Sequence, residues 1–216
     1  MDFAQARHLM VESQVRTSDV TDARILAAMR TLPRERFAPP AVRTLAYADI
    51  ELSVGEGRTL LRPRDLAKLL QALAPQPHER GLEIAGATAY GAAVLGACCA
   101  EVFSLDVDST LSFAGRAALE SAGITNVKTV STDLSAGWAD AAPYNVIFLN
   151  GASEIVPDAW LRQLADGGRL GVIVRQGPAG RARIYTRSGD SIAYRIAFDA
   201  APPVTPSLTQ APSFRF

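Results

Sequence analysis

Three acidic side chains stand at or near the ends of short apolar runs. Glu83 lies in GLEIA, Asp106 ends AEVFSLD, and Asp133 ends NVKTVSTD. Asp106 follows the turn after the first run by about twenty residues, a spacing at which an acid can accept hydrogen bonds from both hydroxyls of a ribose. The helix after that turn would add free N–H groups and a partial positive charge. The pattern therefore indicates a nucleotide-type crevice, with helix capping as the alternative use of each acid.

The elements that would position these acids alternate along residues 81–176. Apolar runs GLEIA, AEVFSLD, NVKTVSTD, YNVIFLN and RLGVIVRQG are separated by the helical segments AYGAAVLGACC, STLSFAGRAALESAG and PDAWLRQLADGG. This alternation predicts a doubly wound, mostly parallel sheet with right-handed crossovers. The carboxyl ends of its strands would meet at one crevice where the strand order reverses, so we expect the three acids and Asn150-Gly151 to converge there.

The flanking segments complete the expected fold. Residues 181–199 contain two alternating runs around Ser188-Gly189-Asp190, which predict a hairpin. Residues 1–75 contain helical patterns, with Thr21 as the expected N-cap of the second helix. The fold class is therefore α/β: a Rossmann-like, doubly wound, mostly parallel seven-stranded sheet with an antiparallel C-terminal hairpin and an N-terminal helical extension. We divide the chain into that extension, 1–75, and a core, 76–216, which form one compact unit, and expect the Pro-rich tail from 201 to pack as extended chain.

Composition excludes several classes of function. The 216 residues carry no formal net charge, so nothing favours binding to nucleic acid or an anionic membrane surface. No apolar run reaches the length of a membrane span, and the N-terminus lacks the apolar region of a secretory signal, so we expect a cytoplasmic protein. Cys98 and Cys99 are neighbours, and His8 and His78 are distant, so we expect no metal site.

Several motifs occur together and in order along nearly the whole chain. They are MVESQVR, PRERF, YAD, GEGRTL, LEIAGATAYGAAVL, VFSLD and AGW. In this combination the chain resembles the protein-L-isoaspartate O-methyltransferases. The resemblance implies the cofactor S-adenosyl-L-methionine and methylation of the carboxylate of L-isoaspartyl residues in damaged proteins or peptides. Because a carboxylate is already ionised at neutral pH, such a reaction needs positioning and water exclusion more than a catalytic base.

The resemblance also implies site residues. Those for the cofactor are Glu83, Ile84, Ala85, Gly86, Ala87, Asp106, Asp133 and Leu134. Those for the substrate are Val54, Gly55, Arg58 and Thr59, with Thr59 and Leu61 at the catalytic positions and further contacts from the C-terminal tail.

The cofactor loop departs from the family pattern. The family motif usually reads like EIGTGSGY, whereas this chain reads EIAGATAY, so Ala85, Ala87 and Ala89 replace glycines. Glycine there permits positive φ and close approach of a ligand, and we expect Gly86 to take over part of the turn. Leu134 also adds bulk where the family often has glycine.

The substrate loop departs as well. Leu61 replaces a serine whose hydroxyl would lie near the methyl-transfer centre, and leucine cannot donate a hydrogen bond. Arg58 or Arg62 could supply positive charge instead, but we expect both to be solvated surface residues.

Two alternatives to isoaspartyl methylation stay open. The loss of the serine favours a methyltransferase of the same fold with another acceptor. The three alanines favour a non-catalytic, degenerate methyltransferase that acts as a binding or scaffold protein. The acceptor, the oligomeric state and any partner protein stay undetermined by the sequence.

Overall fold

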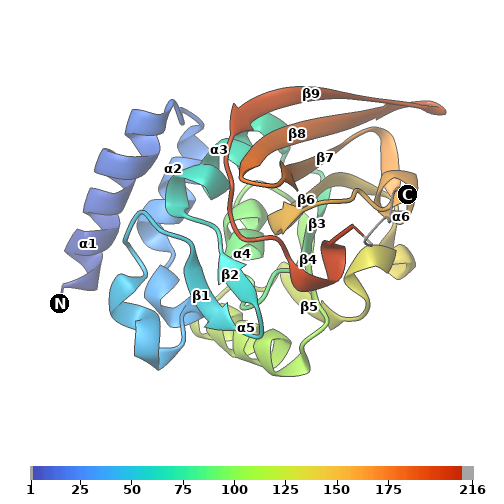
Figure 1. Ribbon diagram of the computed structural model, residues 1–216. Coiled ribbons are helices and arrows are strands. Elements are labelled where there is room, and N and C mark those ends of the chain that lie inside the picture. Colours follow the sequence, from blue (N-terminus) through green and yellow to red (C-terminus); the bar gives the residue numbers. More distant parts are fainter. Residues whose placement is uncertain (1, 211–216) are drawn as a thin grey trace.

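A seven-stranded sheet forms the centre of the computed structural model, which describes residues 2–210 (Figure 1). Its strand order is β5-β4-β3-β6-β7-β8-β9. Neighbours from β5 to β7 are parallel, and β8 and β9 are antiparallel additions, which confirms the predicted fold class. The strands are β3 (Arg80–Ile84), β4 (Glu101–Asp106), β5 (Val127–Ser131), β6 (Tyr144–Ser153), β7 (Leu164–Gln176), β8 (Ala179–Ser188) and β9 (Ser191–Asp199).

The strand order reverses between β3 and β6. The chain runs from β3 outward through β4 and β5, and then returns to the other side of β3 to form β6. Ile84 at the end of β3 pairs with Leu105 of β4 and Leu149 of β6; β4 ends one residue beyond this position, and β6 continues to Ser153. Ligands in open α/β sheets bind beyond such carboxyl ends, which defines where the site should be sought.

The crossover helices match the predicted pattern except at one place. They are α4 (Tyr90–Gly96), α5 (Ser109–Ser121) and α6 (Asp158–Arg162), with short 3₁₀ turns η5 (Leu134–Ala136) and η6 (Ala139–Ala141). We expected a helix over PDAWLRQLADGG that stops at its two glycines, but α6 already ends at Arg162. Leu164 already pairs with Tyr144 of β6, and Gly167 has a left-handed φ of 71° that no helix contains.

The N-terminal part consists of helices that pack on one side of the sheet (Figure 1, blue). They are α1 (Phe3–Met10), α2 (Ala23–Thr31) and α3 (Pro63–Leu73), with the shorter turns η1 (Val11–Val15), η2 (Arg16–Ser18), η3 (Arg34–Phe37) and η4 (Pro40–Leu45). Asp22, not Thr21, caps α2, because its carboxylate accepts from the N–H of Arg24. The N–H of Thr21 donates instead to Gln71 of α3 at 2.6 Å. Among the described residues no helix is long and apolar enough to cross a membrane.

Ala74 ends α3 in a left-handed conformation, with φ 48°, and its side chain is exposed. A left-handed residue that carries a Cβ costs about 1 kcal/mol or more relative to glycine. Ala74→Gly is therefore expected to stabilise the protein by about 1 kcal/mol, seen as a higher urea midpoint with an unchanged slope. The control is Ala72→Gly inside the same helix, which should lower stability by about 0.5–1 kcal/mol. Two shifts of the same sign would contradict the prediction.

A separate hairpin lies outside the main sheet. It consists of β1 (Leu52–Gly55) and β2 (Arg58–Leu60), joined through Glu56 and Gly57, which both have positive φ. The chain after β9 turns back toward this hairpin (Figure 1, red) and forms η7 (Pro206–Leu208). Pro206 packs so close to Gly57 that a Cβ there would lie 2.8 Å from its ring. The tail therefore contacts the hairpin tip, and its residues 211–216 lie outside the described part.

Candidate functional site

The loop between β3 and α4 has three alanines in a conformation that favours glycine. Ala85, Ala87 and Ala89 have φ of 56°, 51° and 65°, all left-handed. Such a conformation costs an alanine about 1–2 kcal/mol, which the surrounding contacts must offset. We had expected Gly86 to take over part of the turn, and this was wrong, because the φ of Gly86 is not positive. Gly86 is needed for close packing instead, since a Cβ there would lie 2.0 Å from Ser104 Oγ.

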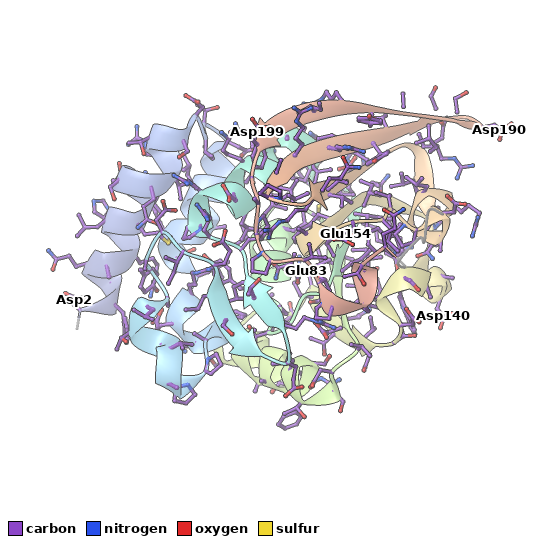
Figure 2. All side chains as sticks on the ribbon, in the orientation of Figure 1. Asp2, Glu83, Asp140, Glu154, Asp190 and Asp199 are labelled. Atoms are coloured by element: carbon purple, nitrogen blue, oxygen red, sulfur yellow. The ribbon has the colours of Figure 1, made fainter. Side chains whose placement is uncertain are left out.

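Glu83 lies at the centre of the molecule (Figure 2) and is completely buried. Its Oε2 accepts a hydrogen bond from Ser104 Oγ at 2.7 Å, and its Oε1 has no partner. A Cβ on Gly91 would lie 2.2 Å from Oε1, so the carboxyl group packs beneath the first turn of α4. Burial raises the pKa of Glu83 to about 8, and Glu83 is therefore mostly a neutral acid at pH 7.

Asp106 ends β4, and its carboxylate is fully engaged. The N–H of Ala87 donates to Oδ2 at 2.9 Å, and the N–H of Asp108 donates to Oδ1 at 3.1 Å. Nε of Arg58 lies 3.2 Å from each of the two oxygens. Only 1% of Asp106 is exposed. The acid that the spacing predicts for a ribose therefore exists at the switch point, but it already binds protein groups.

Arg58 is not the solvated residue that we expected. Strand β2 alternates, so that Arg58 and Leu60 point inward on either side of Thr59, and Arg58 is 5% exposed. Arg62 is only half-buried and pairs with Glu51 at 2.7 Å. The expectation was wrong for Arg58 because a three-residue strand gives too short a pattern to show which side faces the core.

Asp133 differs from the other two acids in its exposure. Strand β5 ends at Ser131, and Asp133 is exposed and caps η5, accepting from the N–H and the hydroxyl of Ser135 at 2.7 and 2.8 Å. These hydrogen bonds lower the pKa of Asp133. Next to it, Leu134 is buried and its C=O accepts from Trp160 Nε1. The structure thus buries Glu83 and Asp106 side by side, and it places the exposed Asp133 at the end of the neighbouring strand, where Ser131 pairs with Asp106.

The remaining substrate-loop residues differ in exposure. Val54 is buried, Gly55 is exposed and Thr59 is half-buried. The side chain of Leu61 is completely buried in the core. Its N–H donates to Oδ1 of Asn150, at 3.2 Å, and Nδ2 of Asn150 has no partner. The end of β6 therefore holds the base of the hairpin.

Arg34 is a site-organising residue for which the sequence suggested no role. It is completely buried, and it donates from Nε to the C=O of Ala46 at 2.8 Å and from Nη2 to the C=O of Leu61 at 2.9 Å. Its guanidinium lies 4.6 Å from the ring centroid of Tyr90, on α4. Arg34 thus joins three segments beneath the loop. Arg34 lies in the PRERF motif, but the sequence spacing does not show that its partners are Ala46 and Leu61, which are 12 and 27 residues away.

In this conformation Asp106 and the loop after β3 are covered by other protein groups. Both oxygens of Asp106 are hydrogen-bonded, and residues 85–89 are all buried. The residues that could hold a cofactor are present, and Arg58 of the β1–β2 hairpin covers Asp106 among them.

The sheet is doubly wound, a strand–turn–helix loop lies at its switch point, and an acid ends the next strand. These features define a nucleotide-binding class of α/β protein. Residues 5–199 match the family model Protein-L-isoaspartate(D-aspartate) O-methyltransferase, and the chain belongs to this family. The family depends on S-adenosyl-L-methionine.

Relatives in two bacteria support the assignment. A protein-L-isoaspartate O-methyltransferase of Methylorubrum extorquens is 39% identical over 179 residues, which cover 83% of this chain and 77% of that protein. One from Opitutus terrae is 40% identical over 173 residues, covering 80% and 73%.

Solved structures show the same fold. A protein-L-isoaspartate O-methyltransferase structure superimposes with a TM-score of 0.81 at 24% identity, covering 94% of this chain and 67% of that one. A Plasmodium falciparum structure described as the same kind of enzyme, in complex with S-adenosyl-L-homocysteine, gives a TM-score of 0.77 at 14% identity, covering 93% and 98%.

Proposed function

We propose that this protein is an S-adenosyl-L-methionine-dependent O-methyltransferase that methylates the carboxylate of L-isoaspartyl residues in damaged proteins or peptides. The family match over residues 5–199 carries the proposal. The buried acid at the end of β4 and the left-handed loop after β3 support it. Its acceptor is an isoaspartyl-containing protein or peptide, and we infer no nucleic-acid or membrane partner and a cytoplasmic location.

The proposed roles follow the two sides of the site. Cofactor contacts are assigned to Glu83, Ile84, Ala85, Gly86, Ala87, Asp106, Asp133 and Leu134. Substrate contacts are assigned to Val54, Gly55, Arg58 and Thr59, and Thr59 and Leu61 are assigned to the catalytic positions. Leu61 provides no hydroxyl, so orientation of the acceptor would depend on the rest of the hairpin and on exclusion of water.

The test is transfer of a labelled methyl group to a synthetic isoaspartyl peptide. The matched control is the same peptide with an ordinary aspartyl residue, and a competent family member serves as the positive enzyme. We expect base-labile label on the isoaspartyl peptide alone. Absence of label under conditions in which the positive enzyme transfers methyl groups would reject the proposed acceptor.

A second candidate is a methyltransferase of the same fold with another acceptor. It is favoured by Leu61, whose side chain is buried where the family has a hydroxyl. Binding of S-adenosylhomocysteine without label on the isoaspartyl peptide would select this candidate. If the protein neither binds S-adenosylhomocysteine nor labels the isoaspartyl peptide, the non-catalytic binding protein is selected.

A further inference from the structure

One ion pair joins the substrate hairpin to the cofactor acid. Arg58 and Asp106 are 48 residues apart in sequence, and their side chains are 6% and 2% exposed. In the described part of the chain Arg58 is the one cation paired with Asp106. The pair therefore closes the switch point from the side of the hairpin.

The contacts of Asp106 leave no acceptor site for a ribose. An ionised carboxylate has about four lone-pair sites. Two of its contacts are fixed loop amides, from Ala87 and Asp108, and both oxygens also face Nε of Arg58. The hydroxyls of a ribose would need the acceptor positions that Arg58 occupies. Arg58 and a nucleoside therefore cannot bind Asp106 at the same time.

We propose that Arg58 competes directly with the cofactor for Asp106, so that the β1–β2 hairpin must carry Arg58 away before S-adenosyl-L-methionine binds. This inference rests on the proposed function. It makes Arg58 a residue that sets cofactor affinity and couples cofactor entry to the hairpin that carries the proposed substrate residues. The apparent affinity is reduced by the fraction of molecules in which Arg58 remains paired.

The structure of the hairpin suits such a movement. Strands β1 and β2 pair only with each other in the described structure, over four and three residues, and the register shifts between Ser53 and Gly55. No strand pairing therefore ties the described hairpin to the main sheet; side-chain packing of Leu52, Val54 and Leu60 in the core holds it there. Its base is fixed, since the backbone of Leu61 bonds to Asn150 and Arg34. Movement is thus confined to the segment before Leu61, which contains Arg58.

The test is calorimetric titration of S-adenosylhomocysteine into the wild-type protein, Arg58→Met and Arg62→Met. Arg62 is the matched control, because it is four residues away, pairs with Glu51 and Asp65, and does not contact Asp106. We expect Arg58→Met to bind about tenfold more tightly or better, and Arg62→Met to bind like the wild type. Hydrogen exchange of residues 52–60 in the wild type should increase on binding, which tests the movement without any substitution.

The outcomes separate the inference from the function on which it rests. Equal or weaker binding by Arg58→Met, or unchanged exchange in residues 52–60 with ligand bound, would overturn the role of Arg58 and leave the cofactor assignment standing. No binding by any of the three proteins would overturn both.

Discussion

Asp106→Ala is expected to lower the free energy of unfolding by about 3–5 kcal/mol, the largest effect of any single substitution in the site. Two causes add. The substitution leaves the guanidinium of Arg58 buried without its anion, and it removes the acceptor of the loop amides of Ala87 and Asp108. Urea unfolding followed by circular dichroism measures the change.

Two further variants make this prediction specific. Asp140→Ala removes an exposed carboxylate and should change stability by less than about 0.5 kcal/mol. The double variant Arg58→Met/Asp106→Leu should be more stable than Asp106→Ala, because no unpaired cation is then buried. A loss for Asp106→Ala no larger than that for Asp140→Ala would contradict the buried pair.

Glu83→Gln is expected to remove most of the loss of stability between about pH 5 and pH 8. The folded pKa of Glu83, about 8, lies above its ordinary value of 4.5, so over this interval the folded state holds a proton that the unfolded state has lost. The contribution of Glu83 to the free energy of unfolding is therefore fully present below about pH 4.5. It falls as pH rises towards 8, by about 1.4 kcal/mol per pH unit and by at most about 4–5 kcal/mol in total.

The measurement is a series of urea titrations from pH 4.5 to 8.5 on the wild type and Glu83→Gln. Asp65→Asn is the matched variant, because burial raises the pKa of Asp65 only to about 6, so its contribution should end near that pH. The wild type and Glu83→Gln should diverge most above pH 6. Parallel pH profiles for these two proteins would refute a neutral, buried Glu83.

The sheet could be predicted because its signals are long and local. YNVIFLN is an almost continuous apolar run and forms part of the buried strand β6. Two alternating runs around Gly189-Asp190 form β8 and β9, with Ser188 opposite Ser191. Helix α3 begins at Pro63, and proline is well suited to the first turn of a helix. In each case local preference and tertiary packing agree.

The chemistry of the acids could not be predicted to the same degree. An acid at a strand end can bind a ligand or cap the next turn, and only coordinates separate Asp133, which caps η5 in this structure, from the buried Asp106. The partner of Asp106 was also hidden, because β2 is three residues long and Arg58 lies 48 residues earlier in the chain.

The alanine loop shows how the fold overrides residue preference. Residue type alone argues against positive φ at Ala85, Ala87 and Ala89, yet all three have it. The amide of Ala87 bonds to Asp106 and the amide of Gly86 to the C=O of Leu105 at 2.9 Å, so β4 helps hold the turn in place. The shape of a cofactor loop therefore persists without its glycines.

The most direct test of the account is a crystal structure of the protein with S-adenosylhomocysteine. We expect the ribose at the carboxylate of Asp106, the hairpin displaced before Leu61, and Arg58 no longer paired with Asp106. A bound ligand that leaves the Arg58–Asp106 pair intact, or that lies away from the ends of β3 and β4, would contradict it.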